Sequence, residues 1–251
     1  MVACYRKAGK EPPTGAPGGL SWKMIRWDIN AQTAFKEVPQ RVFWGLTDPE
    51  LPKYIKEGLD FVYVDNPYFN RSSQRNTFRL IRKNVHLTTL LERPDDRARK
   101  FGLKLLPWRK GGLWKDIVVI PPSPYYEKIY GAENWLKQTV NQLMRVTSRE
   151  IRVKYNKSIP LEGYLKRTHA VVTFGSTAGV EAAMLGVPVF SGPICPSLPV
   201  TAGNINHIDN PHYPENRQAW LNGLAYATWT FDEFQGINKT DYWYEQHIHC
   251  R

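Results

Sequence analysis

The stretch VVTFGSTAGVEAAMLGVPVF, residues 171–190, decides the fold class of this chain. It begins with an apolar run, turns at Gly175, continues through small residues and breaks at Gly186 before a second apolar run. These features are typical of a buried strand, a helix that packs closely on a sheet, and a second buried strand. Because short links between such elements indicate parallel strands, the stretch predicts an open α/β sheet.

Segments on both sides of this stretch continue the alternation. Strands are predicted at 40–46, 60–65, 116–123 and 149–156, and helices at 48–59, 131–147, 160–168 and, as one or two helices, 216–234. The segment 79–87 is ambiguous, and 106–112, with its Pro and its Gly pair, is interpreted as a linker. We therefore predict an α/β protein with two compact Rossmann-like parallel-sheet domains, 1–110 and 111–251, that face a cleft.

The charge of the chain is strongly positive and unevenly distributed. The formal net charge is +11 over 251 residues, and the segment 71–115 alone holds thirteen basic residues against three acidic ones. A basic excess of this kind attracts nucleic acid, anionic lipid or phosphorylated substrates. Its concentration in one segment favours a polyanion-binding face over an ordinary solvated surface.

Cysteine usage and hydropathy indicate the compartment. Cys4, Cys195 and Cys250 are odd in number and widely separated, so no disulfide framework is expected. No apolar stretch has the length of a membrane span, and the N-terminal residues lack the apolar centre of a signal peptide. We expect a cytoplasmic protein without a membrane span and, since no ligand cluster stands out, without a metal site.

The turn after the first apolar run carries the residues with the clearest chemistry. Gly175 permits a sharp turn, and a hydroxyl of Ser176 or Thr177 can cap the helix, whose first N–H groups would remain free to bind a diphosphate. Glu181, one turn later, can accept the two hydroxyl hydrogen bonds that a ribose offers. The alternative interpretation is a plain N-cap followed by an acid that the helix dipole favours.

The segment GSTAGVEAAMLGVPVF, residues 175–190, resembles the donor-site motif of GT-B glycosyltransferases, closest to the branch that includes capsule-polysaccharide transferases. The resemblance covers about residues 116–234, and IRVKYN (151–156) is similar to the strand that precedes the donor motif in that branch. It implies a nucleotide-sugar co-substrate such as a UDP-sugar and no further cofactor. The implied donor-binding residues are Gly175, Ser176 and Thr177 at the phosphates, Glu181 at the ribose, and Arg152 and Lys154 at the leaving diphosphate.

The first half of the chain shows a second, weaker resemblance. Residues 42–71, VFWGLTDPELPKYIKEGLDFVYVDNPYFNR, resemble bacteriophage proteins of this fold that are suspected of placing sugars on hydroxymethylated DNA bases. The implied activity is transfer of a sugar from the donor to a hydroxymethylated pyrimidine, such as hydroxymethylcytosine, in DNA. For a phage protein the compartment would be the host cytoplasm.

Inverting glycosyl transfer needs a base for the proton of the acceptor hydroxyl. Asp65 is the first candidate, because it ends an apolar strand at the edge where ligands bind in parallel sheets. A turn-capping role for Asp65 is the alternative. His86 is the second candidate, against a role in packing or hydrogen bonding. Cationic side chains and a helix N-terminus would stabilise the diphosphate, so the reaction is expected to be metal-independent.

The basic residues that follow Asp65 predict the acceptor site. Their spacing of three or four would place several on one helical face, where they could hold a phosphate backbone. The predicted DNA-binding residues are Arg71, Arg75, Arg79, Arg82 and Lys83. Three other functions remain open: a glycosyltransferase for a surface glycan or lipid-linked acceptor, a non-catalytic DNA-binding protein of the same fold, and a sugar-nucleotide epimerase.

Overall fold

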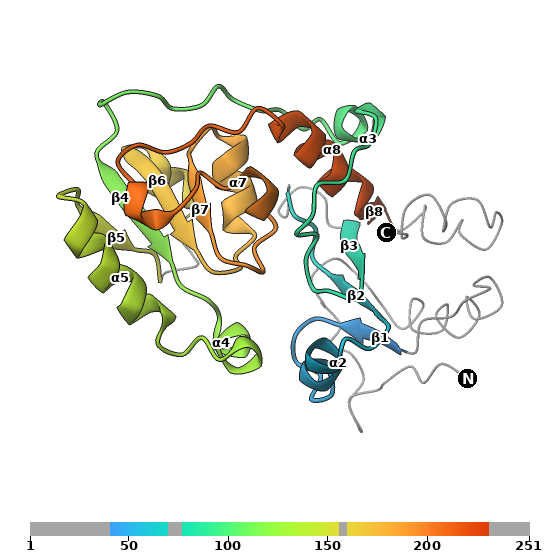
Figure 1. Ribbon diagram of the computed structural model, residues 1–251. Helices are drawn as coiled ribbons and strands as arrows, with labels where there is room; N and C mark the ends of the chain where they lie inside the picture. The colour runs from blue at the N-terminus through green and yellow to red at the C-terminus, as the bar shows by residue number, and fades with distance from the viewer. Residues whose placement is uncertain (1–40, 70–76, 156–159, 231–251) are drawn as a thin grey trace. The chain divides into compact units, whose positions relative to one another are not determined.

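The computed structural model describes residues 41–69, 77–155 and 160–230. They form two compact units (Figure 1). The first unit comprises residues 86–223 and contains sheet B. The second contains sheet A and comprises the described parts of 1–85 and 224–251. The predicted boundary at 110/111 lies inside the sheet B unit.

Sheet B consists of the strands that the apolar runs predict. Its strands are β4 (Asp116–Ile120), β5 (Ile151–Val153), β6 (Thr168–Thr173) and β7 (Val189–Ser191). The spatial order is β5-β4-β6-β7, and all three pairings are parallel. The prediction of a parallel α/β sheet is confirmed here. The strand order changes direction once: β5 is added on one side of β4, and β6 and β7 are added on the other, so the switch point lies between β4 and β6.

Helices cover both faces of sheet B. They are α4 (Pro124–Tyr130), α5 (Trp135–Val146), α6 (Leu161–Leu165) and α7 (Ala178–Met184), with α5 and α7 on opposite sides of the sheet (Figure 1). Leu143 of α5 is fully buried against Ile117, Val119 and Val172. The small residues of α7 allow close packing, because a Cβ atom on Gly179 would lie 2.6 Å from Ser197 Oγ.

Sheet A differs from the prediction of a second parallel sheet. Its strands are β1 (Arg41–Trp44), β2 (Phe61–Asp65), β3 (Thr77–Arg82) and β8 (Thr228–Thr230), in the order β1-β2-β3-β8. Only β1 and β2 pair in parallel; β3 is antiparallel to both β2 and β8. The parallel pair is joined through α2 (Leu51–Glu57), in agreement with the predicted strand, helix and strand.

The C-terminal part of the described chain corrects a second prediction. Helix α8 (Arg217–Tyr226) is followed at once by β8, whereas the sequence predicted helix through 216–234. Phe78 pairs with Trp229 and Thr77 with Thr230. Residues 228–230 are therefore held in a strand by antiparallel pairing with β3. Thr and Trp favour a strand over a helix, and Thr228 and Trp229 are buried in it.

The predicted linker at 106–112 also proves to be attached to the sheet B unit. It follows α3 (Asp96–Lys100), and its backbone donates from Leu106 N to Met184 O and from Arg109 N to Gly186 O, both at 2.8 Å. Gly186 has a φ of +77°, and a Cβ atom there would lie 2.0 Å from Pro107 O. Glycine is therefore required where this segment crosses the end of α7.

Two short 3-10 helices, η1 (Leu198–Val200) and η2 (Ile205–His207), complete the sheet B unit. Across the ranges 41–69, 77–155 and 160–230, no helix combines the length and the apolar character that crossing a bilayer requires.

Candidate functional site

The carboxyl edge of sheet B, where its strands end, contains the predicted donor turn. In open parallel sheets ligands bind at this edge, beside the point where the strand order reverses. That point lies between β4 and β6. Ser123, after β4, is the N-cap of α4 and accepts from Tyr126 N at 3.4 Å, while Gly175, Ser176 and Thr177 follow β6. The fold therefore brings two helix starts with capping serines to the two sides of the switch point.

The Ser176 turn is closed by its own hydrogen bonds. Ser176 Oγ accepts from Ala178 N at 3.2 Å, and Ser176 O accepts from Gly179 N at 3.0 Å. Ser176 N in turn donates to Thr173 Oγ1 at 3.3 Å. The expectation that the first helical N–H groups remain free is wrong for Ala178 and Gly179, because the first turn tightens into 3-10-type bonds. The N-cap of α7 is Thr177, which makes no side-chain cap hydrogen bond, and the preceding Ser176 hydroxyl accepts from Ala178 N instead.

A buried chain of thiol and hydroxyl groups supports this turn from below. Cys195 Sγ lies 3.6 Å from Ser176 O, as a donor, and 3.0 Å from Ser197 Oγ, which lies 2.7 Å from Ser191 Oγ. Burial raises the pKa of the Cys195 thiol, so the group stays neutral at physiological pH and acts as a structural donor. Sequence reasoning missed this network; its only signal was a group of small polar residues after an apolar strand.

Gly175 and Glu181 complete the predicted turn. Gly175 is buried, and a Cβ atom on it would lie 2.8 Å from Ile194 Cδ1, so the turn packs against the chain that follows β7. Glu181 is exposed on α7, one turn beyond Thr177. The structure thus places Gly175, Ser176, Thr177 and Glu181 within one loop and helix, as the sequence predicts.

The two predicted cations, Arg152 in β5 and Lys154 directly after it, meet at Tyr164. Arg152 NH2 is 3.0 Å from Asp116 Oδ2 and also donates to Tyr164 O at 2.7 Å. The Lys154 ammonium lies 4.9 Å from the centre of the Tyr164 ring, beside the Arg152 guanidinium at 5.8 Å. Asp116 begins β4, whereas Ser176 follows the end of β6. The structure therefore brings Arg152 and Lys154 together at Tyr164 and directs Arg152 to the opposite edge from Ser176.

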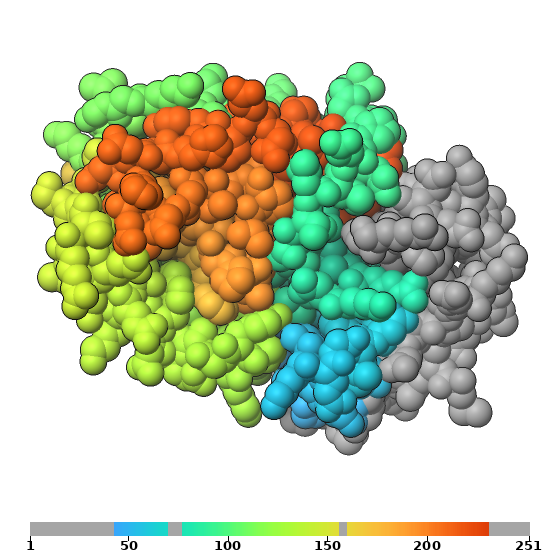
Figure 2. All heavy atoms as spheres, viewed as in Figure 1, coloured from blue at the N-terminus to red at the C-terminus, as the bar shows by residue number. Residues whose placement is uncertain are grey.

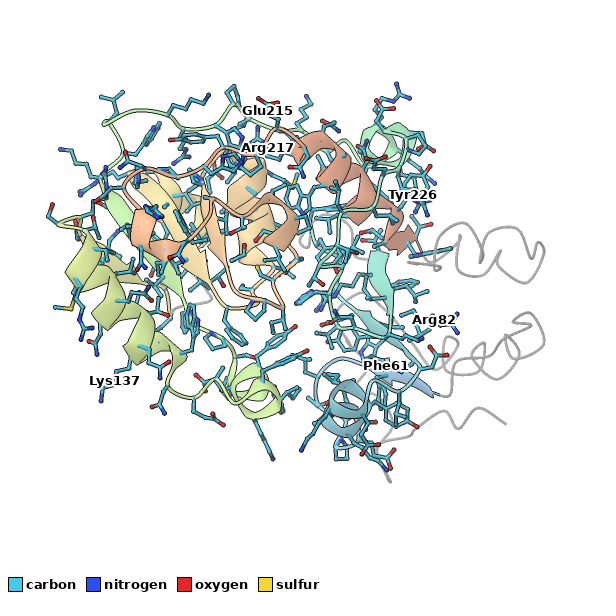
Figure 3. The ribbon with its side chains drawn as sticks, viewed as in Figure 1. Phe61, Arg82, Lys137, Glu215, Arg217 and Tyr226 are labelled. Atoms are coloured by element: carbon cyan, nitrogen blue, oxygen red, sulfur yellow. The ribbon has the colours of Figure 1, made fainter. Side chains whose placement is uncertain are left out.

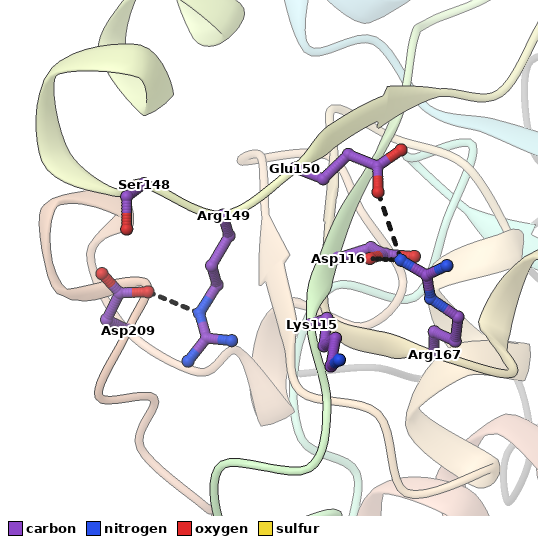
Figure 4. Close-up of a pocket in the computed structure, with 7 residues that line it drawn as sticks. All are labelled: Lys115, Asp116, Ser148, Arg149, Glu150, Arg167 and Asp209. Atoms are coloured by element: carbon purple, nitrogen blue, oxygen red, sulfur yellow. Dashed lines mark hydrogen bonds and ion pairs between the residues drawn. The ribbon is translucent and has the colours of Figure 1, made fainter.

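A hollow of about 490 Å³ lies at the amino edge of sheet B, where the strands begin (Figure 4). Its lining residues are Lys115, Asp116, Ser148, Arg149, Glu150, Arg167 and Asp209. Arg167 bridges Asp116 at 2.9 Å and Glu150 at 3.2 Å, and Arg149 pairs with Asp209 at 2.6 Å. Three cations and three carboxylates line the hollow, and the ion pairs of Arg149 and Arg167 engage all three carboxylates. The arrangement stabilises the strand starts, and it does not single out a ligand of either charge.

Rings from several elements pack beside the carboxyl edge of sheet B. Phe174, directly before Gly175, meets Tyr130 and Trp135 edge-on, with ring centres 6.2 and 5.9 Å away. Among the described residues the buried Tyr130 hydroxyl has no hydrogen-bond partner, and burial raises the pKa of Tyr130 to about 12. These rings form an aromatic surface next to the donor turn.

His86, the second candidate base, belongs to this aromatic group. Its side chain is buried, stacks on Tyr126 with an angle of 9° between the rings, and places Nε2 2.7 Å from the Tyr126 hydroxyl. A buried ring in this position has the packing and hydrogen-bonding role that the sequence left as its alternative.

Asp65, the first candidate base, ends β2 in sheet A. Its Oδ2 accepts from Tyr63 Oη at 2.8 Å and from Arg79 NH2 at 2.7 Å, and its Oδ1 accepts from Asn66 N at 2.7 Å. The Asp65 side chain remains 24% exposed, while that of Arg79 is 2% exposed. The carboxylate is thus committed to a buried guanidinium and to the turn that follows, in line with the turn-capping alternative.

The predicted DNA-binding group does not form a helical face. Residues 77–82 are strand β3, so Arg79 and Arg82 do not follow helical spacing. Arg79 is buried beneath Asp65. Arg82, which is labelled in Figure 3, makes a two-pronged ion pair with Asp60 at 2.8 Å for each bond. Lys83 is exposed, with a φ of 61°. Arg71 and Arg75 lie outside the described residues.

No protein-family model matches the sequence, and no curated protein matches it significantly. Within residues 41–69, 77–155 and 160–230, no cluster of three or more His, Cys, Asp or Glu side chains is placed to hold a metal ion.

Proposed function

We propose that this protein is a glycosyltransferase that binds a nucleotide-sugar donor at the carboxyl edge of sheet B. One observation carries the proposal. The turn with Ser176 and Thr177 and the acid Glu181 follow β6 at the switch point of an all-parallel sheet, where such sheets bind ligands. The resemblance of residues 175–190 to a donor-site motif supports the same assignment.

The proposed roles take account of the contacts already made. Ser176 and Thr177 hold the diphosphate, and Glu181 accepts hydrogen bonds from the ribose hydroxyls. Arg152 is engaged by Asp116 and is not assigned a role at the leaving group. The charge of the leaving group is assigned to Lys154, because it follows the end of β5 at the carboxyl edge of the sheet. The Phe174 and Tyr130 rings line the site with apolar surface.

In the proposed reaction an acceptor oxygen attacks the anomeric carbon of the sugar. The new C–O bond forms as the bond from that carbon to the diphosphate breaks, and the nucleoside diphosphate leaves with the electron pair. The acceptor proton passes to a general base. Asp65 already accepts hydrogen bonds from Arg79, Tyr63 and Asn66 N and is not assigned this role. The proposed acceptor is a hydroxymethylated pyrimidine in DNA.

The donor site is tested by the melting temperature of the protein with UDP, GDP, CMP and their sugars, because a ligand that binds the native state raises it. We expect one nucleotide class to raise it and Glu181→Gln to remove the effect. Glu162→Gln is the matched control, an exposed acid in the first turn of α6. Equal loss in both variants, or no shift with any nucleotide, contradicts the donor site.

The acceptor is tested separately with radiolabelled sugar from the donor so identified. Transfer to DNA that contains hydroxymethylated pyrimidines, and not to unmodified DNA, is the expected result. Transfer only to a glycan or lipid-linked acceptor would replace DNA as the acceptor and retain the enzyme class. Donor binding without transfer to any acceptor would argue against a transferase.

A further inference from the structure

The segment 97–115, here called the basic strap, has the sequence RARKFGLKLLPWRKGGLWK and contains no acidic residue. Its seven basic residues are Arg97, Arg99, Lys100, Lys104, Arg109, Lys110 and Lys115. Since the predicted DNA contacts at Arg79 and Arg82 are engaged by carboxylates, this strap is the strongest remaining concentration of positive charge in the described chain.

The strap is held firmly along the sheet B unit. Besides its backbone bonds to the end of α7, Trp108 Nε1 donates to Pro214 O at 3.1 Å, and the Arg217 guanidinium lies 4.0 Å from the centre of the Trp108 ring. Lys115 N donates to Arg167 O at 2.8 Å, just before β6. Green atoms of the strap lie at the surface in Figure 2. Its cations are therefore presented on a fixed backbone.

The basic residues of the strap differ in their exposure and in the contacts that they make. Arg97 is buried, Arg99 pairs with Asp95 at 3.1 Å, and Arg109 lies 4.5 Å from the centre of the Trp114 ring. Burial lowers the pKa of the Arg109 guanidinium, which is consistent with its structural role.

All four lysines of the strap are exposed, and three of them, all but Lys100, follow helix α3. Lys104, Lys110 and Lys115 are exposed, and none of them makes an ion pair within residues 41–69, 77–155 and 160–230. Lys110 is positioned by the Tyr213 ring, whose centre is 5.2 Å from the ammonium. These three ammonium groups are available to an external anion.

We propose that the basic strap binds the phosphate backbone of duplex DNA through Lys104, Lys110 and Lys115. The inference rests on the proposed function, for which it supplies the surface that holds the polymeric acceptor. Phosphate contacts by lysines bind DNA without regard to base sequence. The strap does not read single strands by stacking, because Arg217 lies over Trp108 and Arg109 lies over Trp114.

The strap lies away from the donor turn. It crosses the C-terminal end of α7 and reaches the start of β4, whereas the Ser176 turn precedes the N-terminal end of α7. The strap therefore lies at the amino edge of the sheet, and its phosphate contacts are distinct from the residues of the donor turn.

The test is the affinity for a duplex of about 20 base pairs, measured by fluorescence anisotropy over a range of salt concentrations. The slope of log Kobs against log salt is negative, and each lost phosphate contact makes its magnitude smaller by about 0.9. The triple variant Lys104→Ala, Lys110→Ala and Lys115→Ala is expected to reduce that magnitude by about 2.7, and the triple Lys→Arg variant at the same positions to retain it.

The matched control removes the same charge from exposed lysines of other elements of this unit. Its positions are Lys128, Lys137 and Lys166, of which Lys137 is labelled on α5 in Figure 3. We expect the control to keep the wild-type slope. Equal slopes for the strap and control variants would overturn the proposal, as would binding to anionic lipid vesicles with no affinity for DNA.

Failure of the strap is distinguishable from failure of the proposed function. DNA affinity is measured without a nucleotide-sugar, and donor binding is measured by melting temperature without DNA. If the wild-type protein binds the donor but shows no salt-dependent affinity for DNA, only the proposal for the basic strap is rejected. If the protein binds DNA through the strap but binds no nucleotide-sugar, the proposed glycosyltransferase function is rejected.

Discussion

The amino and carboxyl edges of sheet B differ in how far their polar side chains are committed to one another. At the amino edge Asp116, 1% exposed, is held by Arg152 and Arg167, and Arg149 pairs with Asp209. At the carboxyl edge the polar groups are the hydroxyls of short side chains, and Glu181 stands exposed beyond them. Buried ion pairs stabilise the strand starts at the amino edge, whereas the carboxyl edge carries the hydroxyl groups and the exposed acid of the proposed donor turn.

This difference also teaches how to read the other candidates. Asp65 ends a strand, as a ligand-binding carboxylate would, yet it is engaged like the residues of the amino edge, by Arg79, Tyr63 and Asn66. Position at a strand end is thus a weaker guide to function than the number of partners already present.

The largest expected effect extends the comparison to sheet A. Asp65→Ala leaves the Arg79 guanidinium, 2% exposed, without its carboxylate and should lower the free energy of unfolding by about 3 to 4 kcal/mol. Urea denaturation measures the change, and Asp65→Asn, which keeps an oxygen acceptor, should cost less. An Ala variant as stable as the wild type would leave Asp65 as a purely catalytic candidate.

The second effect concerns the attachment of the strap at the amino edge. Gly186→Ala should cost about 3 kcal/mol, from the positive φ and the contact of a Cβ atom with Pro107 O. Gly111→Ala is the matched control: its φ is +90°, but nothing lies within 4 Å, so only about 1 kcal/mol is expected. Equal losses in thermal or urea denaturation would mean that the strap is not held at Gly186.

The third prediction tests the ion pairs of the amino edge directly. Asp116→Ala should lower the free energy of unfolding by about 2 kcal/mol, because two guanidinium groups lose a buried acceptor but remain partly hydrated. Asp209→Ala, at a position 41% exposed, should cost less than about 1 kcal/mol. Nucleotide binding should survive both changes; its loss in Asp116→Ala alone would move the ligand site to this edge.

The fourth prediction tests the carboxyl edge. Ser176→Ala removes the cap at Ala178 N and should cost about 1 kcal/mol of stability, while it weakens nucleotide binding. Asn204→Ala, which removes the cap of η2 at Asn206 N, is the control for stability alone. If both variants bind the nucleotide equally well, the Ser176 hydroxyl has only its capping role.

The smallest effect at neutral pH is expected for Tyr130→Phe, since among the described residues its hydroxyl has no hydrogen-bond partner. The change should alter stability by less than about 1 kcal/mol at pH 7. The pKa of Tyr130 is raised from 10.0 to about 12, so the unfolded chain loses this proton first and stability falls as pH rises from about 10 to about 12.

Denaturation at pH 9 and pH 11 should therefore show a smaller loss of stability for the Phe variant than for the wild type. The same loss in both proteins would mean that the Tyr130 hydroxyl is hydrated in solution.

Part of this protein could be predicted because it is encoded locally. The apolar runs at 116–120 and 168–173, and the small residues of α7, indicate strands and a closely packed helix without reference to distant residues. The same holds for the turn at Gly175 and Ser176, where a capping hydroxyl precedes a helix. The strand β8 was missed because residues 228–230 are extended only through their pairing with β3.

The partners of charged residues could not be predicted for the same reason. Arg79 and Asp65 are fourteen residues apart, and Arg167 and Asp116 fifty-one, so their pairing depends on which strands become neighbours. Spacing alone made Arg79 and Arg82 a DNA-binding face, whereas the strand β3 turns both toward carboxylates.

The sequence by itself determined that residues 116–190 form parallel strands with helices between them, because the apolar pattern and the Gly and Pro breaks act over a few residues. Only the tertiary structure decided which polar groups are already engaged. Ion pairs and buried hydrogen bonds form between residues that the fold brings together, and these contacts determine which side chains remain available to a ligand.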